Sequence, residues 1–141
     1  MSLGEIQEIL DDYMFWDDML RRKEREIKNL RERKTAIKTI IDDTPSGDAY
    51  TLEDYMADLD ELEQDKAAFL QKRTDAYRRI QALLQMLDSD KQVEVMTRRY
   101  IKLQSWGRIS RDLSMSRRGV LQLHSRAMDA LSKMKDNHQF L

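Results

Sequence analysis

The chain has 141 residues, of which 40% are apolar and 36% are charged, with four glycines, one proline and no cysteine. This composition excludes disulfides and thiolate metal sites, and it fits long solvated helices better than a thick globular core or a disordered chain. No apolar run approaches the ~20 residues of a membrane span and no signal-peptide core is present, so we expect a cytoplasmic protein.

The net charge of −1 conceals a strong asymmetry along the chain. Residues 1–90 carry 14 Lys+Arg against 22 Asp+Glu, a net of −8, whereas residues 91–141 carry 11 against 4, a net of +7. A basic C-terminal third on an acidic body is the distribution expected of a module that meets a polyanion. A basic tail that is merely solvated is the alternative.

Two long helices with narrow apolar seams are predicted for residues 1–88. Apolar residues recur in steps of three and four in a first series: Ile6, Ile9, Tyr13, Trp16, Leu20, Ile27, Leu30, Ile37 and Ile41. A second series has the same spacing: Leu52, Tyr55, Leu59, Leu62, Phe69, Ala76, Ile80, Leu83 and Leu87. Both series are typical of coiled-coil helices.

Residues 42–48 lie between the two series and contain both proline and glycine, so they predict a loop. Thr51 and Asp54 form a capping-box pattern that starts the second helix. A loop this short folds the two helices back antiparallel as a hairpin. Folding about residues 46 and 47 predicts two ion pairs between the helices, Arg31 with Glu63 and Arg33 with Asp58.

Three serines predict the starts of three further helices in residues 89–141. Ser89 precedes a helix over about residues 90–102 that buries Val93, Met96 and Tyr100. Ser105 caps a short helix over residues 106–113, and Ser116 caps a last helix over residues 117–134. We therefore expect an all-α fold, with a hairpin arm in residues 1–88 and a separate domain in residues 89–141.

The short helix, the turn at residues 114–116 and the last helix predict a helix-turn-helix. Such a motif needs apolar side chains where its two short helices cross, and a small residue such as Ser110 where they approach most closely. The apolar side chains fall at offsets of 0, 4, 6, 11 and 14: Ile109, Leu113, Met115, Val120 and Leu123.

A family resemblance rests on five stretches: Arg98–Ile101, Trp106–Ser110, Leu113–Ser116, Val120 and Ala127–Leu131. Family members typically read aromatic-x-x-Ile-Ala, Leu-x-x-Ser and Ala-Leu at the corresponding places. Residues 91–131 thus resemble region 4 of bacterial sigma factors. They are more similar still to small regulators of Gram-positive phages and prophages, of the RinA/ArpU type. The hairpin is similar to theirs in architecture only.

The resemblance implies a phage-type transcriptional regulator that binds promoter DNA. It implies a recognition helix that begins at Ser116 and reads bases with Arg117, Arg118, Leu121 and Gln122. Arginine can donate two hydrogen bonds to guanine, glutamine can pair with adenine, and leucine can touch a thymine methyl group. Contacts with the DNA backbone are expected from Lys102, Arg108, Arg111, Ser116 and Arg126.

The chain departs from the family pattern at four places. Ser114 replaces the usual turn glycine, so either a positive φ there carries strain or the turn differs from that of the family. Ser110 replaces the commoner alanine, and Gly119 and Leu121 stand where polar residues are frequent in sigma factors.

Trp106 is interpreted as a core residue rather than a platform for stacking bases, and His124 and His138 as surface residues.

No catalytic constellation stands out, so we do not expect an enzyme, and no cofactor or metal site is expected. The aspartate pairs at residues 11–12, 17–18 and 42–43 lack the ligand count of a calcium site. We expect self-association through the hairpin, because several apolar residues lie beside its seam: Met14, Phe15, Met19, Met56 and Leu70.

Two functions of other classes stay open. The module could chiefly bind RNA polymerase or a sigma factor, with secondary DNA contact, as sigma region 4 also does. The chain could instead be the small subunit of a phage terminase, although that family usually places its DNA-binding module before its helical arm.

Overall fold

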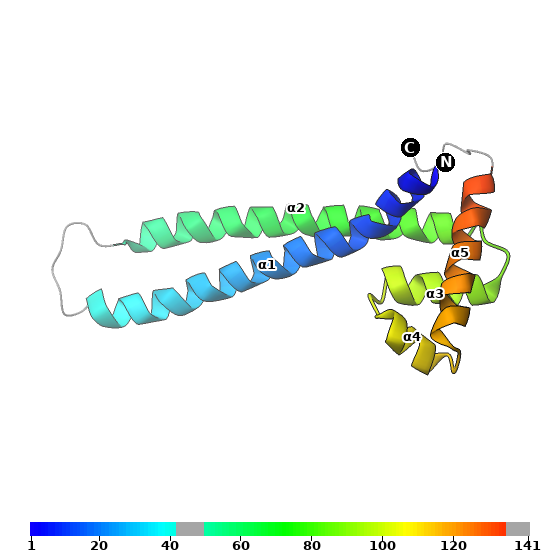
Figure 1. Ribbon diagram of the computed structural model, residues 1–141. Coiled ribbons are helices and arrows are strands. Elements are labelled where there is room, and N and C mark those ends of the chain that lie inside the picture. Colours follow the sequence, from blue (N-terminus) through cyan, green and yellow to red (C-terminus); the bar gives the residue numbers. More distant parts are fainter. Residues whose placement is uncertain (42–49, 135–141) are drawn as a thin grey trace. The chain divides into compact units, whose positions relative to one another are not determined.

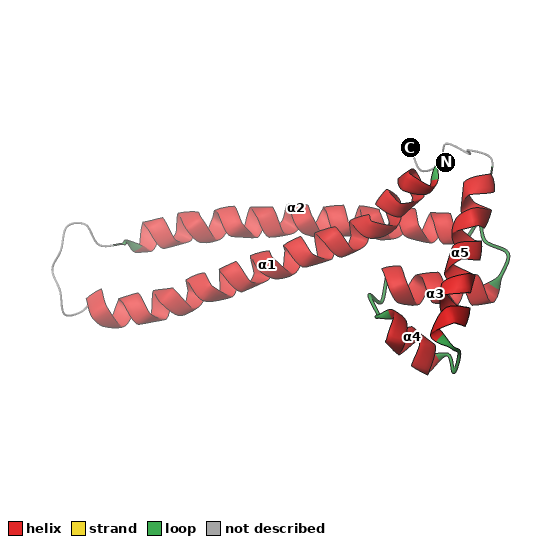
Figure 2. Ribbon diagram, in the orientation of Figure 1, coloured by secondary structure: helices red, strands yellow, loops and turns green. Residues whose placement is uncertain are grey.

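The computed structural model describes residues 1–41 and 50–134, with side chains for residues 1–34 and 50–134, and these ranges hold five helices and no strand (Figure 1). The helices are α1 (Leu3–Ile41), α2 (Leu52–Leu84), α3 (Asp90–Tyr100), α4 (Trp106–Asp112) and α5 (Arg117–Lys133). Short loops connect α2 to α3, α3 to α4 and α4 to α5 (Figure 2). The predicted all-α fold is confirmed.

The chain forms two compact units. The hairpin unit is Asp17–Lys72, and the bundle unit combines Met1–Trp16 with Arg73–Leu141. Helices α1 and α2 each contribute residues to both units. The boundary expected between residues 88 and 89 stays a prediction.

In the hairpin unit, α1 and α2 run antiparallel side by side (Figure 1). The predicted pair between Arg31 and Glu63 is confirmed, with Nη2 3.1 Å from Oε1. Arg33 and Asp58, the other expected pair, line one groove between the helices. Leu20, Ile27, Leu30 and Tyr55 are buried in the seam, and Ile37 and Ile41 fall outside the described side chains.

The seam departs from the prediction where a neighbouring residue is buried in place of the predicted one, and at the start of α2. On α1, Leu10 and Asp17 are buried, whereas the predicted Ile9 and Trp16 are only half-buried. The buried side of α1 thus shifts by one residue at these two places and coincides with the predicted series again from Leu20 onward. The carboxylate of Asp17 is held by the Arg21 guanidinium at 2.9 Å. On α2, Leu52 is 64% exposed rather than buried.

The start of α2 follows the predicted capping box. The Thr51 hydroxyl accepts a hydrogen bond from the Asp54 backbone N–H at 3.1 Å. The Asp54 carboxylate in return accepts from the Thr51 backbone N–H at 3.0 Å. Hydrogen bonding from Thr51, first from its backbone N–H and then from its side chain, favours the ionised carboxylate and lowers the pKa of Asp54. Two N–H groups that α2 cannot satisfy internally therefore have partners.

The bundle unit has a core shared by four helices. Its buried members come from α1, from the end of α2 and the residues just after it, and from α3 and α5: Ile6, Leu10, Ile80, Leu83, Leu84, Leu87, Met96, Tyr100, Ala127, Met128 and Leu131. The N-terminal turns of α1 thus pack against the same apolar residues as the last helix. The seam positions predicted for Ala76, Ile80, Leu83 and Leu87 are confirmed as buried.

A second, smaller core lies under α3, α4 and α5. Val95, Ile109 and Val120 are fully buried there, each with 0% exposure. Partly buried side chains surround them: Trp106, Leu113, Met115 and Leu123. All five apolar positions predicted for the helix-turn-helix therefore meet in one cluster. Val95 was missed on α3, where the prediction named Val93, which is only partly buried.

The three predicted serine caps are confirmed. The hydroxyls of Ser89, Ser105 and Ser116 accept hydrogen bonds from the backbone N–H three residues later, at 3.3, 3.2 and 3.0 Å. Helices α3, α4 and α5 begin at the predicted residues and end one or two residues before the predicted ends. Local hydrogen bonding fixes the starts of these helices.

Ser114 in the turn between α4 and α5 has φ of 52°, the first of the two possibilities left open for this turn. This left-handed conformation disfavours a residue with a Cβ, whereas glycine adopts it without penalty. We expect Ser114→Gly to raise the free energy of unfolding by about 0.5–1 kcal/mol in urea denaturation. Ser125→Gly, the same change inside α5, should lower it by a similar amount, and a loss of stability in both variants would contradict the prediction.

Candidate nucleic-acid interface

Hydrogen bonds within the turn fix the angle between α4 and α5. The Ser110 hydroxyl donates to the Met115 carbonyl, and the Met115 N–H donates to the Ser110 carbonyl at 3.0 Å. Gly119 leaves room for this turn, because a Cβ there would lie 3.2 Å from the Ser116 hydroxyl and 3.3 Å from the Met115 methyl carbon. The departures at positions 110 and 119 therefore have local structural roles.

Helix α5 divides into a buried face and an exposed face. Val120, Ala127, Met128 and Leu131 are buried, and their spacing follows the helical repeat. The opposite face carries one shallow hollow, lined by Arg117, Arg118, Leu121, Gln122, Ser125 and Arg126. Packing of the first face presents the second to solvent, and it includes all four predicted base-reading residues.

The hollow on α5 combines three kinds of recognition chemistry. Its three guanidinium groups are planar donors, the Gln122 amide is both donor and acceptor, and Leu121 offers an apolar side chain that is 39% exposed. Its lining contains no carboxylate. Such a surface is suited to an anionic ligand that presents acceptors and a methyl group at defined positions.

All five residues predicted to contact the DNA backbone are exposed. Of these, the structure places only Arg126 in the hollow with the base-reading residues. Ser116 stands at the N-terminus of α5, and its hydroxyl accepts from the Gly119 N–H while keeping its own proton available to donate. Lys102 follows α3, and Arg111 lies on α4.

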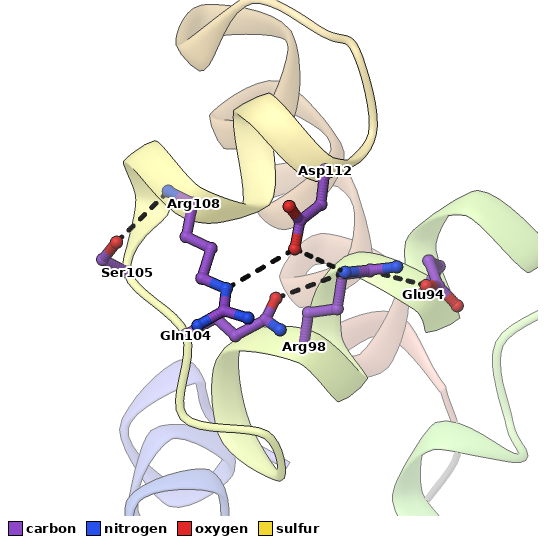
Figure 3. Close-up of polar contacts among 6 residues, drawn as sticks. All are labelled: Glu94, Arg98, Gln104, Ser105, Arg108 and Asp112. Carbon is purple, nitrogen blue, oxygen red and sulfur yellow. Dashed lines mark hydrogen bonds and ion pairs between the residues drawn. The ribbon is translucent and has the colours of Figure 1, made fainter.

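Arg108 is engaged in a charged cluster that sequence reasoning did not foresee (Figure 3). Its Nε lies 3.6 Å from Asp112, and the same carboxylate oxygen lies 3.2 Å from Arg98 Nη1. Arg98 also pairs with Glu94 at 2.6 Å and contacts the Gln104 side-chain carbonyl at 3.4 Å. Asp112 thus joins α3 to α4, and a phosphate at Arg108 would compete with it.

The connection from α3 to α4 depends on a second left-handed residue, Leu103, with φ of 56°. The guanidinium of Arg99 donates to the Gln104 carbonyl at 3.1 Å and stacks over the Trp106 ring at 4.5 Å. Trp106 also packs on the small core, in keeping with its interpretation as a core residue. The Ser105 cap predicted the turn, but no glycine marked the positive φ of Leu103.

His124 is not the surface residue that we expected. It is half-buried, and its Nε2 lies 2.7 Å from the Tyr100 hydroxyl, which also accepts from the Gln7 amide at 3.3 Å. Its ring meets the edge of Trp106 at 5.0 Å. The four-residue spacing from Val120 places His124 on the buried face of α5, a signal that the polarity of histidine obscured.

The environment of His124 predicts a loss of stability in mild acid. Burial, followed by the positive charge of Arg99, lowers the pKa of His124 below its ordinary value. The stabilisation from the neutral ring is complete above the unfolded-state pKa of about 6.5 and is lost as the pH falls toward the lower folded-state value. Urea denaturation should show less stability at about pH 5.5 than at about pH 7.5. His124→Gln should reduce that difference, and an unchanged difference would assign it to other groups.

The described residues contain neither a metal-binding cluster nor a membrane-spanning helix. No group of three or more His, Asp or Glu side chains in that part of the chain could hold a metal ion. Within the same residues, no helix has both the length and the apolar character that crossing a bilayer requires.

Comparison with known proteins adds no relative: no family model, curated protein or solved structure matches this chain.

Proposed function

We propose that the protein is a transcriptional regulator that binds promoter DNA through α4, the turn and α5. The observation that carries the proposal is the exposed face of α5, where Arg117, Arg118, Leu121, Gln122 and Arg126 lie together with no carboxylate in the set. The net charge of +7 over residues 91–141 supports a polyanionic partner. The resemblance of residues 91–131 to sigma region 4 and to RinA/ArpU-type regulators supports a phage or prophage origin.

In this proposal α5 enters the major groove, which is wide enough for a helix and presents a distinct pattern for each base pair. Arg117 and Arg118 donate to guanine O6 and N7, Gln122 pairs with adenine, and Leu121 touches a thymine methyl group. Lys102 and Arg111 contact phosphates and orient the module without reading sequence. The hairpin unit joins the protein to a second copy or to another protein.

The test is selection of bound sites from a random double-stranded DNA library with the full chain. We expect one enriched motif containing at least one guanine, and affinity that falls with salt by a slope of about −0.9 per phosphate contact. Repeating the selection with Gln122→Ala should relax preference at a single adenine position. Absence of binding at low salt, where phosphate contacts dominate, would contradict the proposal.

The same purified full chain can be used to test the two alternative functions. Capture of purified RNA polymerase without any enriched DNA motif would favour a polymerase-binding factor that resembles sigma region 4. A ring-sized oligomer in solution would favour a terminase small subunit. Either result would leave the fold as described and reassign the exposed face of α5.

A further inference from the structure

A series of hydrogen-bonded side chains crosses the bundle unit from α1 through α3 to α5. The Gln7 amide of α1 donates to the Asp11 carboxylate at 3.0 Å and to the Tyr100 hydroxyl at 3.3 Å. The Tyr100 oxygen in turn lies 2.7 Å from His124 Nε2 on α5. In the described part of the chain, this hydroxyl bonds to no other group. We call the set the polar link: Asp11, Gln7, Tyr100 and His124.

The carboxylate at one end of the polar link fixes the direction of its hydrogen bonds. A carboxylate only accepts, so the part of Gln7 that faces Asp11 is the NH2 group. The same nitrogen contacts Tyr100, whose oxygen therefore accepts. The Tyr100 hydroxyl then directs its own proton to His124 Nε2, which must carry a lone pair. A histidine with a lone pair on Nε2 is neutral and has its hydrogen on Nδ1.

The surroundings of His124 favour the same neutral ring. The ring is half-buried, and burial, followed by the positive charge of Arg99 on α3, lowers the pKa of His124. Trp106, the residue of α4 that meets the ring, carries no charge. From α1, the charged group is Asp11, which is separated from the ring by the rest of the polar link. Within the described residues, no carboxylate contacts His124 to stabilise a cation.

We propose that the polar link is a proton-sensitive latch, which holds the start of α1 to α3 and α5 while His124 is neutral and loosens when His124 is protonated. A protonated imidazole is a donor at both nitrogens, so Nε2 no longer accepts from Tyr100. The imidazolium and the Gln7 amide then both donate to the Tyr100 oxygen, and the Tyr100 proton has no acceptor among the described residues. Turning the Gln7 amide over would place its oxygen against the Asp11 carboxylate. The contact between Tyr100 and α1 therefore weakens.

The latch is independent of DNA recognition, and no DNA enters its tests. It differs from a general loss of stability in acid, because it acts on one contact of α1 that is remote from His124 in sequence.

The first test is the position of the hydrogen on neutral His124, measured in the unaltered full chain at about pH 7.5 by nitrogen-15 NMR of the imidazole. The latch requires the hydrogen on Nδ1 and a lone pair on Nε2. His124→Gln identifies the resonances, because it removes them and leaves those of His138. A hydrogen on Nε2 of the neutral ring would overturn the proposal.

In the second test, the sign of the effect decides. Tyr100→Phe deletes the donor that stabilises the neutral ring, so it should raise the pKa of His124 toward its ordinary value in an NMR titration. If His124 instead donated to Tyr100, the same change would lower this pKa or leave it unchanged, and either result would overturn the proposal. Tyr77→Phe is the matched control, because it deletes a hydroxyl that accepts from Gln81 at 3.0 Å on the surface of α2. The control should leave the titration of His124 unchanged.

Loosening of α1 is measured by amide hydrogen exchange at about pH 5.5 and 7.5, corrected for the intrinsic effect of pH on exchange. In acid, protection of residues 7–13 in α1 should fall about 3–10-fold more than protection of residues 127–131 in α5, which reports opening of the whole bundle unit.

Two variants assign this extra loss of protection to the polar link. Gln7→Met breaks the contact with Tyr100 at both pH values and should remove the extra loss. His124→Gln should also remove it, because an amide takes up no proton. An equal loss in the two segments of the unaltered chain, or an extra loss that persists in Gln7→Met, would overturn the proposal.

Discussion

Under the proposed function, replacing Arg117 and Arg118 together by alanine should strongly weaken sequence-specific DNA binding and leave the fold intact. Each arginine that donates two hydrogen bonds to guanine contributes about 1–3 kcal/mol of discrimination, so the pair should lower affinity at least ~30-fold. Both side chains are exposed at the start of α5, where two cations oppose the helix dipole. Their removal should therefore not destabilise the helix, and fluorescence anisotropy with the selected site measures the loss.

A matched control separates base reading from net charge. Arg25→Ala combined with Arg78→Ala removes the same two charges from exposed positions on α1 and α2. That variant should bind the selected site within about 3-fold of the unaltered chain, because loss of remote charge acts only through the overall field. An equal loss of DNA affinity in the two double variants would show that Arg117 and Arg118 make no specific contact with the bases. Polymerase capture that survives Arg117→Ala and Arg118→Ala would in that case favour the polymerase-binding alternative.

Ile109→Ala should destabilise the bundle unit by about 2–5 kcal/mol, the usual range for a large aliphatic side chain removed from a core. Ile109 has 0% exposure and is one of only three fully buried residues in the small core under α3, α4 and α5. The hydrogen bonds between Ser110 and Met115 hold the backbone beside it. The core therefore has little freedom to collapse onto the space that is left.

Amide hydrogen exchange is the measurement for this variant, because it resolves the bundle unit from the hairpin unit. Protection should fall in α4 and at the start of α5 and remain unchanged in the hairpin unit. Leu121→Ala, a truncation of an exposed side chain on the same motif, should change stability by no more than about 0.5 kcal/mol. A loss below about 1 kcal/mol for Ile109→Ala would mean that the small core does not hold the motif together.

Prediction from sequence succeeded where the determining contacts are local. The starts of α3, α4 and α5 follow from serine hydroxyls that bond to the N–H three residues later, and both partners stand within one turn. The five apolar residues of the helix-turn-helix meet as expected because their offsets already encode two crossing helices.

Prediction failed where burial depends on a distant partner. Asp17 is buried although it is charged, because the seam of α1 follows the position of its partner helix and Arg21 supplies a counter-charge. His124 is held by Tyr100 from α3, which its own neighbours in sequence do not reveal. Asp112 pairs with Arg98, fourteen residues earlier, and also with Arg108. Arg108 is therefore less available for a phosphate than its exposure suggests. The base-reading set on α5 stays a prediction about function, although its exposure is established.

The core of the bundle unit is completed by the first turns of α1, since Ile6 and Leu10 pack with Met96, Ala127 and Leu131. The helix-turn-helix motif therefore cannot be excised as residues 89–134 alone without losing part of its core. Its core is completed by Ile6 and Leu10, which precede the first residue of α3 by 84 and 80 positions in the sequence. During synthesis the core of the bundle unit can therefore form only after α5 has been made.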